Sequence, residues 1–136
     1  MSDSNSPTAP ATAEPVLIVD DDKPLLEMWQ AALQSEFDVT TATSAKDAEF
    51  LMRKNSYKVV VSDHLMPGGN GLSFLVRMRE EHPRTQRVLV TGYMKPEMLL
   101  RSVNEAGLLR YYLKPVTITD LVKTIREGIK AYNEFK

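Results

Sequence analysis

Cysteine is absent from the 136-residue sequence, which excludes a disulfide scaffold, a thiolate metal site and a cysteine nucleophile. No apolar run approaches the roughly 18 residues that a membrane-spanning helix needs. The N-terminal stretch lacks the basic start and the apolar core of a secretory signal, so we expect a cytoplasmic protein with no membrane partner. An excess of charge is also missing. The 17 basic and 18 acidic side chains give a formal net charge of -1, which argues against direct nucleic-acid binding.

The length and composition favour a single soluble domain. A chain of 136 residues with 43% hydrophobic side chains has enough apolar material for one core but not for two. Residues 1–14 are rich in Ser, Thr, Ala and Pro and carry no large apolar side chain after the initiator methionine, so we predict a disordered N-terminal tail there. The folded domain is expected to span residues 15–136. No internal repeat is visible.

Short apolar segments along the chain predict five strands. Residues 16–19, 59–61 and 88–90 are continuous apolar runs, which are typical of strands buried on both faces of a parallel sheet. Residues 37–41 alternate between apolar and polar side chains, as a half-exposed edge strand does. Residues 111–113 form the last short apolar segment, and we predict a strand there too.

Helical start and stop signals separate these strands. Pro24 and Pro96 stand where the first turn of a helix tolerates proline. Ser44 and Thr117 are each followed by an acid three residues later, in the manner of a capping box, and Gly107 is a typical helix end. With a third helix from residue 72 to near residue 83, five helices alternate with the strands. This order predicts an α/β domain with a parallel sheet and right-handed crossovers.

The most informative polar residues come directly after buried strands, or within one residue of them. Because the carboxyl ends of parallel strands meet at one edge of the sheet, where ligands bind, side chains from distant parts of the chain are expected to converge there. These residues are Asp20, Asp21, Asp63, Thr91 and Lys114. Three carboxylates, a hydroxyl and an ammonium in one cleft are a specific chemical set.

This set favours a divalent metal ion. Carboxylates about 5 Å apart repel each other by about 3 kcal/mol per pair at an effective dielectric constant near 20, and Lys114 alone does not balance three of them. Mg²⁺ prefers oxygen ligands and keeps several waters, and Mn²⁺ is an alternative. We expect Asp21, Asp63 and the carbonyl of Leu65 to bind the metal directly, and Asp20 to act largely through water.

The same residues suit phosphoryl transfer. A carboxylate beside a divalent ion can attack a phosphoryl group and form an acyl phosphate. The charged oxygens of that group need partners, which the metal, the Lys114 ammonium and the Thr91 hydroxyl supply. We therefore predict that Asp63 accepts the phosphoryl group and that Thr91 and Lys114 assist.

Four segments, VLIVDDD, SDHLMPGGNG, VTGY and YYLKP, resemble in their order the signatures of response-regulator receivers such as CheY. The resemblance spans residues 16–136 and implies a flavodoxin-like, doubly wound five-stranded sheet of order 2-1-3-4-5 with five helices. It also implies Mg²⁺-dependent phosphorylation of Asp63 by a sensor histidine kinase or a histidine phosphotransfer protein. The Lys114–Pro115 peptide is expected to be cis. Thr91 and Tyr111 are implied as the switch pair, in which the hydroxyl moves toward the phosphoryl group and the ring turns inward.

The implied function is a signalling switch of two-component systems, which catalyses only its own phosphotransfer and autodephosphorylation. Its fourth helix, last strand and last helix are expected to form the surface that controls a partner, a homodimer or an output domain. The segments SDHLMPGGNG and NEAGLLRYYLKP also resemble receivers attached to HD-type phosphodiesterases or to transcriptional activators. No output module follows Lys136, so we expect a stand-alone receiver or a fragment of a longer regulator.

Two other functions compete with this one. A haloacid-dehalogenase-like phosphohydrolase would use Asp20 and Asp22 as its Asp-x-Asp motif, followed by a Thr and a Lys. The sequence after Lys114 offers no second acidic pair for the metal, and Asp63 would have no role. A degenerate receiver, acting as a constitutive binding module, is disfavoured because all five key side chains are present.

Overall fold

The structure, a computed structural model, describes residues 13–66 and 69–136. The strands in these residues are β1 (Pro15–Val19), β2 (Asp38–Ala42), β3 (Val59–Ser62), β4 (Gln86–Thr91) and β5 (Arg110–Leu113). The helices are α1 (Lys23–Leu33), α2 (Ala45–Lys54), α3 (Gly71–Glu81), α4 (Pro96–Ala106) and α5 (Ile118–Glu134). The disordered tail predicted for residues 1–14 lies mostly outside the described residues, as do Pro67 and Gly68 of the segment SDHLMPGGNG.

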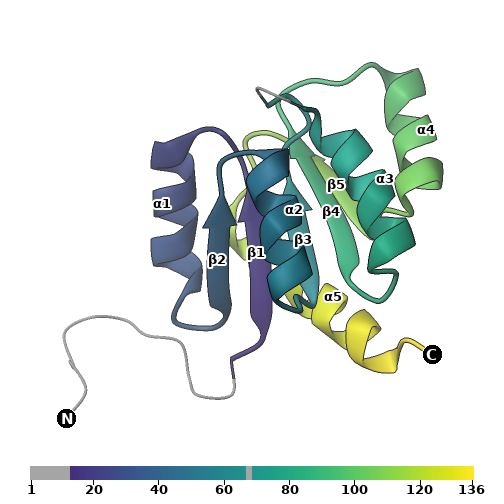
Figure 1. Ribbon diagram of the computed structural model, residues 1–136. Coiled ribbons are helices and arrows are strands. Elements are labelled where there is room, and N and C mark those ends of the chain that lie inside the picture. Colours follow the sequence, from purple (N-terminus) through teal and green to yellow (C-terminus); the bar gives the residue numbers. More distant parts are fainter. Residues whose placement is uncertain (1–12, 67–68) are drawn as a thin grey trace, which may run out of the picture.

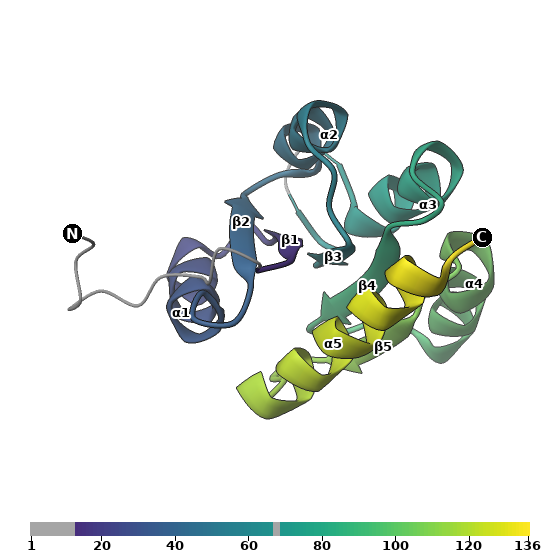
Figure 2. The ribbon, with the colours of Figure 1, turned by 90° about the horizontal axis from the view of Figure 1, so that it is seen from below.

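The five strands of the described chain form one parallel sheet in the order β2-β1-β3-β4-β5. The predicted α/β fold, with its flavodoxin-like strand order, is therefore confirmed. Helices cover both faces of the sheet (Figures 1 and 2). The core on one side includes side chains of α1 and α5, and the core on the other includes side chains of α2, α3 and α4.

The continuous apolar runs are explained by burial on both sides of the sheet. In β1, Leu17 and Val19 belong to the core beneath α2 and α3, whereas Val16 and Ile18 belong to the core beneath α1 and α5. Successive side chains of a strand point to opposite faces, so a strand in the middle of a covered sheet needs an apolar residue at every position. The edge strand β2 has a mostly half-buried pattern instead.

Side-chain caps fix where α1, α2, α3 and α5 begin, whereas α4 has no side-chain cap. The predicted caps at Ser44 and Thr117 are confirmed, because their hydroxyls accept the backbone N–H of the residue three positions later at 3.1 Å and 3.0 Å. Asp22 caps α1 in the same way. The Asn70 side chain caps α3, accepting the backbone N–H of Ser73 at 2.7 Å. Gly107 ends α4 in the left-handed conformation with a φ of 58°, as expected of a glycine helix stop.

Two details of the helices go beyond what the sequence patterns indicate. α1 ends at Leu33, because the carbonyl of Leu33 accepts the backbone N–H groups of Glu36 and Phe37 and turns the chain. The inner face of α5 includes Thr124 and Gly128, which hydrophobic patterning does not identify. A Cβ atom on Gly128 would lie 2.6 Å from Cγ2 of Val59, so this glycine allows α5 to approach the sheet closely.

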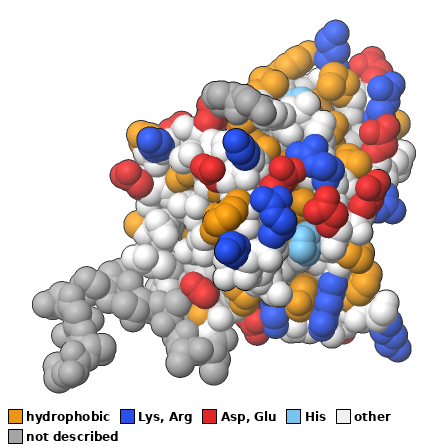
Figure 3. All heavy atoms as spheres, in the orientation of Figure 1, with side chains coloured by type: hydrophobic (Ala, Val, Ile, Leu, Met, Phe, Trp, Pro, Cys, Tyr) orange, Lys and Arg blue, Asp and Glu red, His pale blue; other side chains and the backbone are white. Residues whose placement is uncertain are grey.

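The face of the molecule drawn in Figure 3 carries side chains of both charges. Figure 3 shows basic and acidic side chains interspersed on the face that carries α2 and α3. Within residues 13–66 and 69–136, no helix combines the length and the apolar character that crossing a membrane requires.

Candidate functional site

The strand register brings the predicted site residues to one edge of the sheet. Asp20 and Asp63 directly follow the paired strands β1 and β3, and the backbone N–H of Asp63 donates to the carbonyl of Val19 at 3.0 Å. On the other side of β3, Thr91 ends β4 and Lys114 follows β5. The backbone N–H of Lys114 donates to the Thr91 carbonyl at 2.8 Å. Residues far apart in the sequence therefore lie on neighbouring strand ends, as the fold class predicts.

Three carboxylates form a cluster at this edge. Asp20, Asp21 and Asp63 each offer one oxygen, and these oxygens all lie within 4.8 Å of one another. Asp20 is 1% exposed and Asp63 is 8% exposed, whereas Asp21 is exposed to solvent. The spacing agrees with the separation of about 5 Å that the electrostatic argument assumed.

Lys114 is a shared cation for two of these carboxylates. Its Nζ donates to Oδ2 of Asp20 at 2.6 Å and to Oδ2 of Asp63 at 3.3 Å. Burial lowers the pKa of Lys114, but the hydrogen bonds and charges of Asp20 and Asp63 outweigh burial and leave the pKa above its ordinary value. One ammonium against three carboxylates leaves negative charge uncompensated. An all-oxygen donor set with excess negative charge fits a hard divalent cation.

The carboxylate oxygens differ in what they contact. Oδ1 of Asp20 accepts the backbone N–H of Asp22 at 2.9 Å, so both of its oxygens have protein partners. Oδ1 of Asp63 accepts the backbone N–H of His64 at 2.7 Å, and its Oδ2 has only the longer contact with Lys114 among the described residues. Leu65, whose carbonyl is a predicted metal ligand, lies two residues beyond Asp63 and is 64% exposed.

The two predicted switch residues differ in exposure. Thr91 is 1% exposed, and the single contact of its hydroxyl within the described residues is a long one, of 3.5 Å to the carbonyl of Tyr93. The side chain of Tyr111 is 45% exposed. The neighbouring Tyr112 is half-buried and its hydroxyl lies 2.6 Å from Oγ1 of Thr124.

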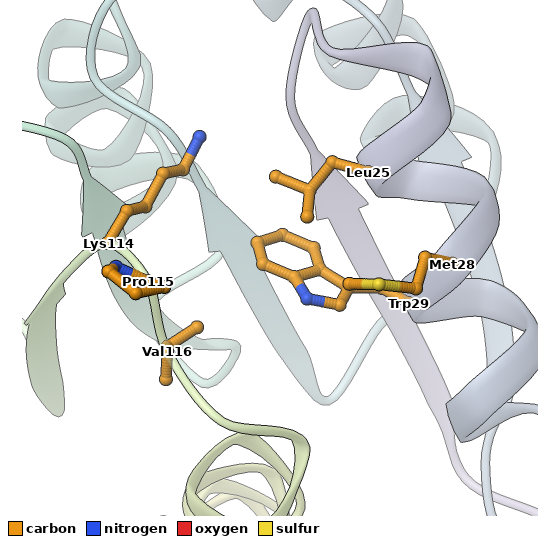
Figure 4. Close-up of a pocket in the computed structure, with 6 residues that line it drawn as sticks. All are labelled: Leu25, Met28, Trp29, Lys114, Pro115 and Val116. Atoms are coloured by element: carbon orange, nitrogen blue, oxygen red, sulfur yellow. The ribbon is translucent and has the colours of Figure 1, made fainter.

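A groove of about 350 Å³ lies beside the site. Figure 4 shows Leu25, Met28 and Trp29 of α1 on one side of it, and Lys114 and the residues that follow on the other. The Lys114–Pro115 peptide in its wall is cis, as expected. Trp29 is the single tryptophan of the sequence, so its fluorescence can report changes around Lys114.

Sequence reasoning missed one polar contact in the site. Ser62 is the last residue of β3, is completely buried, and donates from Oγ to the carbonyl of Asp63 at 2.8 Å. A signal for it exists in the sequence, because Ser62 is a polar residue that follows directly on the run Val59–Val61 in the same buried strand.

Comparison with known proteins decides the family. The family model of the response regulator receiver domain matches residues 16–126. This chain belongs to the response regulator receiver family. Receivers are signalling modules of two-component systems that interact with histidine kinases and bind Mg²⁺ at an acidic pocket. The match decides against the haloacid-dehalogenase-like hydrolase.

Relatives of this receiver are parts of longer regulators. The hydrogenase transcriptional regulatory protein HoxA of Cupriavidus necator is 36% identical over 116 residues, which make up 85% of this chain and 24% of HoxA. The receiver thus spans about a quarter of the length of this curated relative.

Solved receiver structures superimpose closely on this one. A CheY-like receiver of Methanospirillum hungatei has a TM-score of 0.86 and 27% identity, and the match covers 92% of this chain and all of that one. The beryllofluoride-activated receiver dimer of NtrC4 has a TM-score of 0.81 and 25% identity over 87% of this chain and 98% of that one.

Proposed function

We propose that this receiver accepts a phosphoryl group on Asp63 and acts as a phosphorylation-operated switch. The observation that carries the proposal is the placement of the Asp63 carboxylate. It stands in a cluster of three carboxylates at the carboxyl edge of the sheet, and its Oδ2 lies 3.3 Å from Nζ of Lys114. A nucleophile beside a cation suits an acceptor of a negatively charged phosphoryl group.

The donor in this proposal is a sensor histidine kinase or a histidine phosphotransfer protein. An oxygen of the Asp63 carboxylate forms a bond to phosphorus while the bond between phosphorus and the donor histidine nitrogen breaks. That nitrogen keeps the bonding electron pair. The Lys114 ammonium stabilises the charge on the phosphoryl oxygens, and the Thr91 hydroxyl donates to one of them once the group is in place.

The metal ligands are proposed to be the carboxylates of Asp21 and Asp63 and the carbonyl of Leu65. Asp20 is proposed to act through water, because Lys114 engages its Oδ2 more closely, at 2.6 Å, than it engages Oδ2 of Asp63, at 3.3 Å. Mg²⁺, when bound, offsets the negative charge of the carboxylates and of the incoming phosphoryl group.

The switch is proposed to start at Thr91 and Tyr111. The long contact of the Thr91 hydroxyl leaves it available for a stronger hydrogen bond to a phosphoryl oxygen. Its movement makes room for the exposed Tyr111 ring to turn inward. A ligand can bias two conformations only through contacts that differ between them, and these contacts exist only when Asp63 carries the phosphoryl group.

The output surface is proposed to comprise α4, β5 and α5. Large apolar side chains are exposed there, among them Leu100 at 69% and Leu113 at 52%. The side chains of Arg110 on β5 and Glu127 on α5 form an ion pair at 3.0 Å. Such a surface suits a protein partner, a second copy of this chain or an output domain. The proposed surface also includes Leu108, Leu109, Arg110, Tyr112, Lys95 and Arg101.

Beryllofluoride, which mimics the acyl phosphate, tests the proposal. In the presence of Mg²⁺ it should change the fluorescence of Trp29 and the amide exchange of α4 and β5 in the wild-type protein, but not in Asp63→Asn. No response of the wild-type protein would favour a receiver that works as a constitutive binding module.

A further inference from the structure

The carbonyl of Asp63 is enclosed by two small residues. The buried Ser62 hydroxyl donates to this carbonyl at 2.8 Å, and no other hydrogen bond to it is made by the described residues. Gly71, the first residue of α3, packs against the same oxygen. A Cβ atom on Gly71 would lie 1.6 Å from the Asp63 oxygen and 2.7 Å from Oγ of Ser62. A side chain at position 71 would therefore clash with the Asp63 carbonyl and the Ser62 hydroxyl, and glycine avoids this clash.

The peptide group between Asp63 and His64 connects this contact to the acceptor carboxylate. Its carbonyl end is held by Ser62, and its N–H end donates to Oδ1 of Asp63 at 2.7 Å. A peptide group is planar and rigid, so an interaction that fixes the carbonyl direction also fixes the N–H direction. Oδ1 is thereby held by the backbone, and Oδ2 is left facing Lys114.

We infer that Ser62 is a positioning residue for phosphoryl transfer to Asp63. Its hydroxyl orients the 63–64 peptide plane, and the plane orients the carboxylate that attacks phosphorus. This inference rests on the proposed function. A carboxylate that rotates away from the line of attack reacts more slowly, and a displacement of about 1 Å costs up to about 100-fold in rate. Loss of one neutral hydrogen bond permits a smaller displacement, for which we expect about a tenfold loss.

Ser62→Ala tests the inference, with Thr85→Val as the matched control. Thr85 is also buried, and its hydroxyl donates to the backbone carbonyl of Tyr57 at 2.6 Å. It directly precedes β4, so it lies at the amino ends of the strands, away from the site. Both variants lose a buried hydrogen bond and should lose stability. Only Ser62→Ala should lower the maximal rate of phosphorylation by acetyl phosphate at saturating Mg²⁺, by about tenfold. The half-saturating concentration of acetyl phosphate should change less than about twofold.

A second readout reports the peptide plane directly. The amide proton of His64, which is held by Oδ1 of Asp63, should shift in the NMR spectrum of Ser62→Ala and exchange faster with solvent, and it should stay unchanged in Thr85→Val. A wild-type phosphorylation rate in Ser62→Ala with an unshifted His64 amide would overturn the inference. An equal loss of rate in Thr85→Val would overturn it as well.

A third variant covers the case in which Ser62→Ala does not fold. Ser62→Cys is close in size, and its thiol is a weak donor, so its phosphorylation should also be slow. A wild-type rate in Ser62→Cys would then overturn the inference. A wild-type protein that takes up no phosphoryl group would instead overturn the proposed function on which the inference rests.

Discussion

Nζ of Lys114 lies 2.6 Å from Oδ2 of Asp20, although 94 positions separate the two residues in the sequence. The contact exists because β1 and β5 both end at the same edge of the sheet. Lys114 lies farther from the proposed acceptor Asp63, at 3.3 Å. In this structure, the Lys114 ammonium is therefore held chiefly by Asp20, and it lies within reach of the Asp63 carboxylate.

Replacement of Lys114 by methionine should lower stability in a pH-dependent way. The pKa of Lys114 is raised above 10.5, because the hydrogen bonds and charges of Asp20 and Asp63 outweigh the lowering by burial. A group with a raised pKa in the folded state stabilises the fold fully below its unfolded pKa, and this stabilisation disappears as the pH rises through the folded pKa. Lys114→Met should therefore lower the unfolding free energy by about 1–3 kcal/mol at pH 7, and by less above pH 10.5.

Urea denaturation without Mg²⁺ at neutral and strongly alkaline pH measures this difference. Lys46→Met is a suitable control, because Lys46 is exposed on α2, and its effect should stay within about 0.5 kcal/mol at both pH values. A difference between the wild type and Lys114→Met that grows with pH would contradict the account.

Asp21→Asn should stabilise the metal-free protein and weaken its response to Mg²⁺. Removal of one charge from the cluster of Asp20, Asp21 and Asp63 relieves repulsion, by about 1 kcal/mol because Asp21 is exposed and screened. We expect Mg²⁺ to stabilise the wild type by binding the folded state, and the variant to respond less because it lacks one proposed ligand. Thermal melting with and without Mg²⁺ checks both effects.

Asp22→Asn provides the matched control for this experiment. Asp22 is next to Asp21 but caps α1 by accepting the backbone N–H of Leu25, and asparagine caps a helix equally well. The variant should keep the wild-type response to Mg²⁺. If Asp21→Asn kept that response too, Asp21 would not be a metal ligand.

Arg87→Met should destabilise the fold strongly. Arg87 is 7% exposed, and its guanidinium donates to the carbonyls of Thr85 at 2.6 Å, Ala106 at 2.7 Å and Gly107 at 3.3 Å. Methionine keeps the apolar stem but leaves these carbonyls without their donor, which we expect to lower the unfolding free energy by about 2–4 kcal/mol. Arg101→Met, at an exposed position of α4, should have almost no effect in the same denaturation experiment. A loss below about 1 kcal/mol in Arg87→Met would contradict this role.

The strands that carry the site could be predicted because each buried run ends on a polar residue. Residues 16–19 and 59–61 are followed, directly or after one residue, by Asp20 and Asp63, and the parallel sheet brings these ends together. The caps at Ser44 and Thr117 could be predicted because they depend on local hydrogen bonds. Patterns of neighbouring residues are sufficient for such features.

Features that depend on distant backbone atoms could not be predicted. Arg87 looks like an exposed residue of a strand, but its partner at Ala106 is 19 positions away. Glycine is unfavourable inside a helix when only the local sequence is considered. Gly128 is needed because a larger residue would clash with Val59 of β3. Ser62 is a different case, because its partner is the adjacent Asp63 and its place after the run Val59–Val61 is visible in the sequence. Only the close approach of Gly71 to this contact depends on a distant element. The exposure of Tyr111 depends on how β5 packs in the folded chain, which the local sequence does not specify.

Peptide mapping by mass spectrometry tests the central claim most directly. The wild type and Asp63→Asn would be treated with acetyl phosphate and Mg²⁺, digested at low temperature and analysed for the modified residue. The account predicts one phosphoryl group per wild-type molecule, located on Asp63, and none on the variant. An equally modified Asp63→Asn, or a phosphoryl group on another residue of the wild type, would contradict it.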